Sequence, residues 1–357
     1  MEKQLVKKLT LVLVLLCSMI CISLCFLPQF THWATQKIAF YRALQEEARM
    51  REEMSALELM RMHEQEIGNT VREKLGESIR MAYLEDGKLS DVVVEENYLG
   101  HEITIFFPNL TEKSLNQYPI IGSTRHLKDM KVTEQDGGLR VSFVTDVIVE
   151  PVMAKRKGFC YVTLKEPREL YDRIVVVDAG HGGKMPGAVM NGLKEKNINL
   201  QIVQNLKNYM DKEKNLKVYY TRLTDCHVEL KDRAKLANEL KANLFVSIHQ
   251  NAIGNRYGSV RGTQVLYNSK LTGAKGSKEL ARIMLEHTMQ AFQSDNKGLV
   301  RADGIYIIRK SKVPVALVEV GFMTNRMELN RLGNKKIQKK IAKGIRDGIM
   351  EALEKGF

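Results

Sequence analysis

The chain has 357 residues, of which 44% are hydrophobic and 27% charged, so it is long enough to bury a sizeable core and to carry an accessory domain. Its formal net charge is +13, and nucleic acid is one partner that such a charge attracts. The lysines and arginines are scattered, however, and no aromatic residues alternate with them. This pattern argues against a nucleic-acid-binding protein and favours another anionic partner.

The five cysteines do not indicate a disulfide framework. Three of them lie at positions 17, 21 and 25, inside an apolar N-terminal run, which leaves Cys160 and Cys226. Neither of these two has a close cysteine neighbour in the sequence, so a zinc site made of cysteines is not expected. We expect both to have packing roles.

The apolar run at residues 9–27 contains no charged side chain and follows Lys3, Lys7 and Lys8. Nineteen such residues can span a bilayer core, and the lysines favour a cytoplasmic N-terminus. A cleaved secretory signal is the alternative, but no Ala-x-Ala-like site follows the run, and Leu24 is too bulky for lipoprotein cleavage. We expect residues 1–33 to form a cytoplasmic stub and a transmembrane anchor. Both interpretations place the rest of the chain outside the cytoplasm.

Residues 34–80 are rich in helix-forming residues of mixed charge. Their apolar side chains approximate a heptad seam that Glu64 interrupts: Met50, Met54, Leu57, Met60, Ile67, Val71 and Leu75. One interpretation is a helix that self-associates or binds a partner. The other is a solvated stalk, or a helix packed on the next domain, and the short, broken seam favours this second interpretation.

Residues 81–165 are expected to form a small all-β domain. Residues 92–94, 103–107 and 159–162 are strand-like. Asp136-Gly137-Gly138 provides the turn of a hairpin over residues 131–144. A small antiparallel sandwich fits this pattern. Pro167 blocks continuation of the last strand and marks a linker.

Residues 170–357 alternate between strand-like and helix-like segments. Apolar strands are predicted at 174–177, 218–220, 244–248 and 315–320, and helices over 230–240, 276–292 and 335–353. This alternation predicts an α/β domain in which helices flank a mostly parallel sheet. The last helix concentrates positive charge, either as a solvated face or as a contact surface for an anionic polymer, at Lys335, Lys336, Lys339, Lys340 and Lys343.

Three of these strands carry polar side chains that are able to hold a metal. His181 lies between glycines after the strand 174–177, His249 ends an apolar run, and Glu319 interrupts an apolar strand. Glu195 lies just ahead of a predicted amphipathic helix. Open α/β sheets place their ligands at the carboxyl ends of the strands. Two histidines and a carboxylate are a zinc-like ligand set with one position left for water, and a further glutamate would complete a metal-hydrolase site.

Five ordered motifs between Arg173 and the C-terminus carry a family resemblance: Asp178-Ala-Gly-His-Gly-Gly, Glu195-Lys-x-x-Asn199-Leu, Thr221-Arg222, Ser247-Ile-His249-x-Asn-Ala and Val318-Glu-x-Gly-Phe. This part of the chain resembles the zinc-dependent N-acetylmuramoyl-L-alanine amidases. The resemblance implies that His181, Glu195 and His249 bind Zn²⁺, that Glu319 is the catalytic glutamate, and that the sheet is a single mixed one. Gln264 departs from the family pattern, in which many relatives have Glu, but it lies outside the ligand set.

Two residues near the ligands are candidates for supporting roles. Asp178 either orients His181 as a hydrogen-bond acceptor or caps a nearby helix. Asn251 follows His249 closely and is a candidate for substrate contact.

Two arginines lie at predicted strand ends. Arg222 and Arg309 are each able to bind a peptide carboxylate of the substrate with two hydrogen bonds. The alternative is a structural ion pair with an acid such as Asp225 or Asp303.

The resemblance predicts a membrane-anchored hydrolase, facing the cell wall, that cleaves the amide between N-acetylmuramic acid and L-alanine in peptidoglycan. Zinc activates water, and Glu319 takes its proton and passes it to the departing nitrogen. The alternatives are a zinc peptidase acting within the stem peptide and a non-catalytic wall-binding scaffold. The small β domain is either a spacer or, as its position in some relatives implies, a wall-targeting domain. An anionic wall polymer or lipid surface is the expected partner of the positive charge.

Overall fold

The computed structural model describes residues 13, 15–16, 77–84 and 88–357. The chain separates into two compact units, Met1–Lys74 and Leu75–Phe357. The anchor predicted at residues 9–27 and the helix predicted at 34–80 fall almost entirely outside the described residues. In the described ranges, no helix is both long enough and apolar enough to cross a membrane.

The first part of the second unit contains two antiparallel sheets. One has the strand order β4-β1-β8-β7 and the other β2-β3-β6-β5. Their strands are β1 (Ile79–Tyr83), β2 (Val93–Asn97), β3 (Glu102–Pro108), β4 (Ile121–Gly122), β5 (Leu127–Gln135), β6 (Gly138–Thr145), β7 (Glu150–Arg156) and β8 (Phe159–Lys165). Short helical segments η1 (Leu89–Asp91), η2 (Tyr98–Gly100) and α2 (Glu112–Gln117) connect them.

Alternating side chains explain why these two sheets share one core. On β3, Ile103, Ile105 and Phe107 are buried while their neighbours are partly exposed, as expected for a strand with one face inward. The predicted hairpin at 131–144 is confirmed and is longer than expected, because β5 pairs with β6 along nearly its whole length. Its turn residues Asp136 and Gly137 both have positive φ, as a two-residue type I′ turn requires.

The remaining chain forms a six-stranded mixed sheet with the order β12-β9-β13-β16-β14-β15. The first four strands run parallel, while β14 is antiparallel to β16. The predicted α/β class with a mostly parallel sheet is confirmed. The strands are β9 (Arg173–Ala179), β12 (Leu216–Tyr220), β13 (Leu244–Asn251), β14 (Thr263–Tyr267), β15 (Asn296–Arg301) and β16 (Val315–Phe322), with a small hairpin of β10 (Val189–Met190) and β11 (Leu193–Lys194).

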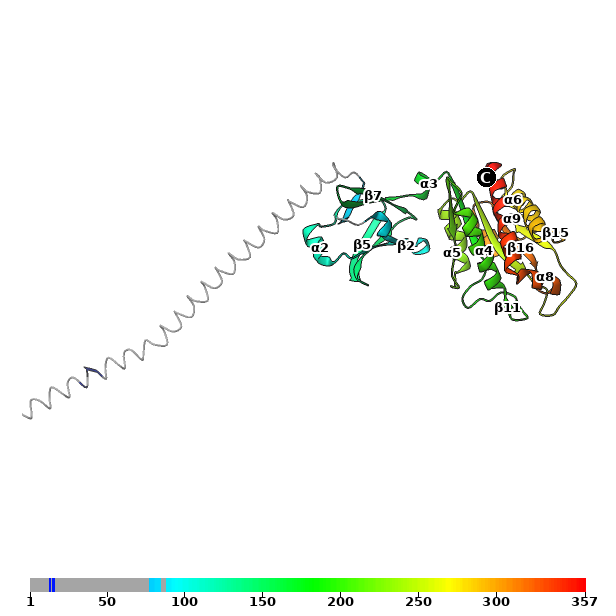
Figure 1. The fold of residues 1–357 in the computed structure, drawn as a ribbon, viewed down its shortest axis with the longest axis horizontal. Coiled ribbons are helices and arrows are strands. Elements are labelled where there is room, and N and C mark those ends of the chain that lie inside the picture. Colours follow the sequence, from blue (N-terminus) through cyan, green and yellow to red (C-terminus); the bar gives the residue numbers. More distant parts are fainter. Residues whose placement is uncertain (1–12, 14, 17–76, 85–87) are drawn as a thin grey trace, which may run out of the picture. The chain divides into compact units, whose positions relative to one another are not determined.

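Helices cover both faces of this sheet (Figure 1). They are α4 (Glu195–Met210), α5 (Leu230–Glu239), α6 (Ser277–Phe292), α7 (Tyr306–Lys310), α8 (Arg326–Leu332) and α9 (Lys335–Glu354), while the short α3 (Pro167–Leu170) lies in the connection before β9. Val175 and Val177 of β9 join the core beneath α4, α6 and α9. Ile174 and Val176 point the other way, into the core beneath α5 and α7. Because side chains alternate along a strand, Asp178 follows Ile174 and Val176 to the α5 and α7 face.

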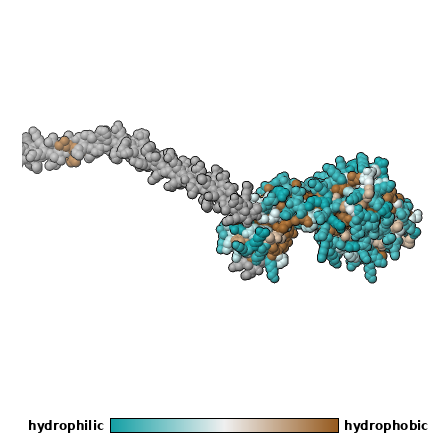
Figure 2. All heavy atoms as spheres, turned by 90° about the horizontal axis from the view of Figure 1, so that it is seen from above, coloured by the Kyte–Doolittle hydropathy of each residue, from teal (hydrophilic) through white to brown (hydrophobic). Residues whose placement is uncertain are grey.

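The long last helix, α9, packs its apolar side against α4 and α6. Its five lysines at positions 335, 336, 339, 340 and 343 are all exposed. They lie on the solvent side of the helix, and a contact there with an anionic polymer stays a prediction. Figure 2 shows mainly hydrophilic side chains over the face of this part of the molecule that it presents.

Within the second unit, the β-sandwich contacts the edge of the six-stranded sheet. Ile148 joins the core beneath α5 and α7. Glu150 is buried and accepts hydrogen bonds from the Tyr219 hydroxyl at 2.5 Å and from Lys217 Nζ at 2.8 Å. The ring of Tyr98 meets that of Tyr219 edge-on, with centroids 4.8 Å apart. The small domain thus completes the packing around β12.

Candidate metal centre

His181 lies in a tight turn that follows β9. Its φ is +63°, and those of Gly182 and Gly183 are +127° and +54°. Side chains rarely adopt this left-handed region, and glycine adopts it easily. At Gly180 a Cβ atom would lie 2.2 Å from His249 Nε2, so only glycine lets the turn approach the second histidine. The glycines therefore place His181 against His249.

Three buried cations hold this turn through its carbonyl oxygens. Arg222 donates to the oxygens of Ala179 at 2.9 Å and Gly180 at 3.0 Å. Arg233 donates to the oxygen of His181 at 2.7 Å, and Lys196 donates to that of Gly183 at 2.9 Å. Hydrogen bonds from charged donors are stronger than neutral ones. We call Lys196, Arg222 and Arg233 the carbonyl clamp.

The carboxylate of Asp178 balances part of this charge. It is fully buried and accepts hydrogen bonds from Arg233 at 2.5 Å, Thr221 at 2.5 Å and Ser247 at 2.6 Å. Burial alone would raise the pKa of Asp178, but Arg233 and the two hydroxyl groups outweigh burial and hold this pKa below its usual value. Both predicted roles of Asp178 are wrong: in the described part of the chain it neither bonds the His181 ring nor caps a helix. It acts on the turn through Arg233.

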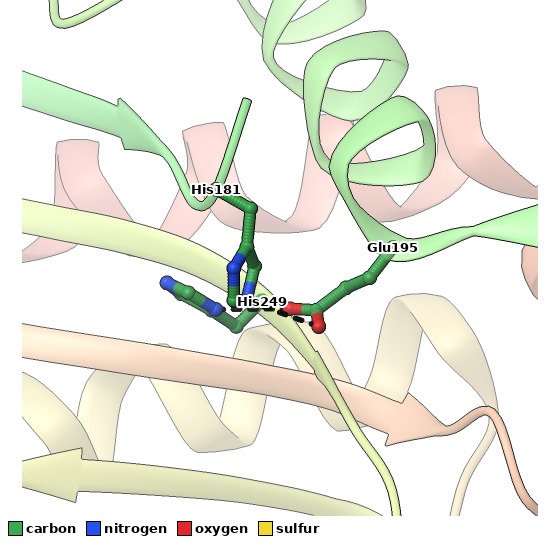
Figure 3. A group of neighbouring side chains, drawn as sticks. All are labelled: His181, Glu195 and His249. Carbon is green, nitrogen blue, oxygen red and sulfur yellow. Dashed lines mark hydrogen bonds and ion pairs between the residues drawn. The ribbon is translucent and has the colours of Figure 1, made fainter. Parts of the chain in front are cut away.

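Glu195 is the first residue of α4, and its carboxylate lies between the two histidines (Figure 3). His181 Nε2 is 3.1 Å from Oε2, and His249 Nδ1 is 2.9 Å from Oε1. The backbone N–H of Ala188 donates to Oε2 and that of Gln250 to Oε1. Burial alone would raise the pKa of Glu195, but the bonds to the two histidines outweigh it and strongly lower this pKa. The carboxylate is therefore fixed and charged.

This cluster fits a metal ion. One ligand atom each from His181, Glu195 and His249 lies within 4.8 Å of the others. A Cβ atom at Gly187 would lie 2.3 Å from Glu195 Oε2, so that glycine keeps space beside the carboxylate. Imidazole nitrogen and carboxylate oxygen are the donors that zinc takes in catalytic sites with three protein ligands. The structure thus brings together the three residues predicted as ligands.

Glu319 lies beside this cluster. On β16 it is the direct neighbour of His249 on β13. Its Oε2 is buried and has no hydrogen-bond partner among the described residues. Burial raises the pKa of Glu319 to about 7, although the neighbouring His249 opposes the rise. A carboxyl group with a pKa near neutral is suited to accept and return a proton.

Residues 175–351 match the family model for N-acetylmuramoyl-L-alanine amidase. The chain is 32% identical to the germination-specific N-acetylmuramoyl-L-alanine amidase of Bacillus subtilis, over 52% of this chain and 83% of that protein. It is 35% identical to the uncharacterized protein YqiI of the same organism, over 50% and 83%. An amidase structure from Clostridium difficile 630 shares 34% identity over 52% of this chain and 98% of that one, with a TM-score of 0.49.

The chain belongs to the N-acetylmuramoyl-L-alanine amidase family. The family predicted from the motifs is therefore confirmed. As an amidase of this family, the protein is an enzyme that acts on the peptidoglycan of the cell wall. The non-catalytic scaffold considered from the sequence is set aside.

Two of the residues predicted to bind substrate have other contacts in this amidase. Arg222 is buried, with 3% exposure, and all three of its guanidinium nitrogens donate to backbone oxygens. Four of its five N–H groups are used in these bonds. It holds carbonyl groups rather than Asp225, so the ion pair considered for Arg222 is wrong, while its contact with substrate stays a prediction. Asn251 is half-buried and donates to Gln264 Oε1 at 3.2 Å, which uses part of its side chain.

Arg309 is exposed on α7, and within the described ranges it donates one long hydrogen bond, 3.3 Å, to the oxygen of Gly304. Asp303 bonds instead to Arg301 and Ser269, so the structural ion pair considered for Arg309 is wrong. Its contact with substrate stays a prediction.

A cavity of about 300 Å³ opens beside the two histidines on the α5 and α7 face of the sheet. We call it the side cavity. Its lining is mainly apolar and includes Met185, His227, Val228, Leu230 and Ile307 next to His181 and His249. These residues come from a loop, a helix start and a short helix that carry no recognisable motif. Arg233 of the clamp lies in no motif either. Lys196 lies in a motif, but its partners Gly183 and Asp225 are distant in the sequence.

Proposed function

We propose that this amidase is a zinc-dependent, membrane-anchored enzyme that cuts the amide between N-acetylmuramic acid and L-alanine outside the cytoplasm. The observation that carries the proposal is the convergence of His181, Glu195 and His249 beside the unpartnered oxygen of Glu319. The family supports the choice of bond, since its relatives are named for it.

His181, Glu195 and His249 would hold the metal at the carboxyl end of the sheet. When bound, zinc supplies Lewis-acid chemistry, since it polarises a carbonyl group and lowers the pKa of water. The carbonyl clamp keeps the His181 turn in place, and the backbone N–H groups of Ala188 and Gln250 keep Glu195 oriented. Such supporting contacts fix ligand geometry.

Glu319 moves the protons of the reaction. Its carboxylate takes one proton from the attacking water as the water oxygen bonds to the carbonyl carbon. The C–N bond then breaks, and Glu319 returns that proton to the departing nitrogen. The second proton of the water passes from the new carboxyl group to the amine, so the products are the lactyl carboxylate of muramic acid and the ammonium group of L-alanine. The pKa of Glu319, raised to about 7 by burial, suits both transfers at neutral pH.

Digestion of purified peptidoglycan with mass analysis of the products tests this proposal. We expect new L-alanine amino groups and intact released stem peptides, without new reducing sugar ends. The activity should disappear with a chelator and return with zinc. Shortened stems still attached to glycan would instead establish the stem-peptidase alternative, and new reducing ends without new amino groups would exclude both.

The anchor proposal is supported by the uncharged residues 9–27 and the three lysines before them. Full-length protein should remain in the membrane fraction, and protease added from outside the cell should reach its catalytic part. A shortened, soluble mature form would establish a cleaved signal instead. Self-association through residues 34–80 is tested with the same material, by comparing its oligomeric state with that of a chain starting at residue 77.

A further inference from the structure

We propose that the side cavity binds the acyl half of the substrate, the muramic acid residue with its lactyl group, while the stem peptide extends over Glu319. This inference rests on the proposed function and adds the direction in which the substrate lies across the centre.

The order of the strands determines on which side of His249 the side cavity and Glu319 lie. Going along the sheet, β9 comes first, then β13, then β16. The side cavity includes Asp178 and His181 from the β9 side and reaches His249 on β13. Glu319 lies one strand further, on β16, and does not line the cavity. The cavity and Glu319 are therefore on opposite sides of His249.

The side-chain faces agree with this arrangement. On β13, Phe245 points into the core beneath α5 and α7, and on β16, Val315 and Leu317 do so. By the two-residue period of a strand, His249 and Glu319 project to that same face. The cavity lies on this face as well, because Leu230 begins α5 and Ile307 belongs to α7. Both halves of a substrate can therefore lie on the same face of the sheet.

The proton transfer decides which half of the substrate lies on the Glu319 side. Glu319 must reach the departing nitrogen to return its proton, so the amine half, which is the stem peptide, lies on the Glu319 side. The carbonyl carbon lies between that nitrogen and its acyl substituent. The acyl substituent therefore points away from Glu319, toward the side cavity.

The chemistry of the cavity suits the acyl half. Its volume lies at the lower end of the range for small-molecule sites. Val228 and Ile307 give it an apolar floor for the lactyl methyl group and the apolar face of a sugar ring. Exposed His227, paired with Glu229 at 3.0 Å, offers hydrogen bonds at the rim.

The stem peptide fits this cavity poorly. Its carboxylates need a cation, and the guanidinium that lines the cavity, Arg233, already donates to Asp178, to the carbonyl oxygens of Ala179 and His181, and to that of Val228. Glu229 at the rim repels a further negative charge. A muramic acid residue whose lactyl carboxyl is in the amide bond is uncharged and meets neither obstacle.

The test removes the apolar rim. Met185 and Leu230 are 53% and 55% exposed, so Met185→Ser and Leu230→Ser together should leave the fold intact. Met327, which is 58% exposed on α8 and does not line the cavity, provides the matched control Met327→Ser. The substrates are N-acetylmuramoyl-L-alanyl-D-isoglutamine and the same dipeptide carrying only a lactyl group.

We expect KM for the muramoyl substrate to rise about tenfold or more in the double variant, the range of a lost apolar contact in a pocket. The values for the lactyl substrate, which lacks the sugar, should stay those of the wild type. The control should match the wild type on both. An equal effect on both substrates, or none on either, would overturn the inference.

A binding measurement separates this inference from the proposed function. The probe is the amide of N-acetylmuramic acid, whose lactyl group is uncharged as in the substrate. Ligand-observed NMR should show that this amide binds more weakly to the double variant, whereas L-alanyl-D-isoglutamine binds equally to both proteins. Weakened binding of the dipeptide alone would place the stem peptide in the cavity and overturn the inference. If wild-type protein binds the amide of N-acetylmuramic acid in this way but leaves the muramoyl substrate uncut, the proposed function fails and the cavity assignment stands.

Discussion

Glu319 is the residue whose position is hardest to explain by packing. A buried carboxyl oxygen without a partner costs free energy, and folded proteins rarely keep one without a use for it. Its neighbours in the sheet are His249 on one side and Gln264 on the other. The group is thus held beside the metal centre without being part of the ligand set.

Replacing Glu319 by Gln tests its role as proton carrier. The amide keeps the shape of the side chain but cannot accept a proton from water, so hydrolysis should fall about 10²–10⁴-fold. Zinc content and the urea midpoint should stay close to wild type. Metal analysis, unfolding and wall digestion on the same preparation check all three. Cleavage at the parent rate would show that Glu319 is not the base.

Asp178 is expected to make the free energy of unfolding of this protein decrease as the pH falls into the acid range. A carboxylate with a depressed folded pKa stabilises the fold fully above its unfolded pKa of about 3.9. That stabilisation is lost as the pH falls through the lower folded pKa. Asp178→Asn leaves the Arg233 charge buried without its partner, and we expect a loss of about 3 kcal/mol at neutral pH.

Urea unfolding of wild type and Asp178→Asn between pH 7 and pH 3 measures this effect. The difference between the two proteins should be constant down to about pH 5 and should shrink below about pH 4. A difference that does not change with pH would show that the charge of Asp178 is not what stabilises the turn.

At the scale of elements, the apolar strands were predictable. Residues 174–177, 244–248 and 315–320 are mostly β-branched or aliphatic, and each is a central, buried strand. Ligand positions followed from the same pattern, because polar residues at the ends of such strands meet at one edge. The hairpin β5–β6 followed from its Asp-Gly turn.

Other elements depend on contacts that no local pattern records. β15 has the sequence Asn-Lys-Gly-Leu-Val-Arg, which alternates poorly, and it exists because its backbone pairs with β14 at the sheet edge. The sequence shows that Arg222 belongs to a motif, but it does not show what Arg222 contacts, because its partners lie on β9 and α4. The contacts of Lys196 and Arg233 and the lining of the side cavity also join segments that are distant in the sequence, so they could not be predicted. The sequence pattern predicts that a residue lies at the end of a strand, but its contacts are known only once the fold is known.

The metal should join three elements: the turn after β9, the start of α4 and the end of β13. A ligand that binds only the folded state stabilises it, by about 2.7 kcal/mol at a hundredfold excess over Kd. Zinc should therefore raise the unfolding temperature of the wild type but not of His181→Ala or His249→Ala. His287→Ala, which removes a histidine paired with Glu351 far from the centre, is the matched control. Full zinc retention in both ligand variants would refute the assignment.

At the scale of the whole molecule, the β-sandwich contributes to the catalytic part. Tyr219 is fully buried, and its hydroxyl donates to Glu150, which belongs to β7 of the sandwich. Ile148, just before β7, fills the core beneath α5 and α7. All three ligand residues and Glu319 nevertheless lie beyond residue 165, and so does the larger core beneath α4, α6 and α9.

These two facts predict how a catalytic fragment behaves. A chain starting at residue 165 should fold and bind zinc, because its ligands and main core are complete. It should be less stable than a chain starting at residue 77, since the Tyr219 hydroxyl loses its buried acceptor, a loss of about 1–3 kcal/mol, and the core around Ile148 becomes exposed to water. Urea unfolding of both chains measures the difference, and Tyr219→Phe in the longer chain isolates the share of this hydrogen bond. If the short chain is insoluble or metal-free while the long one is sound, the sandwich is part of the catalytic fold. If both are equally stable, the contact at β12 contributes nothing, and the sandwich is a separate module.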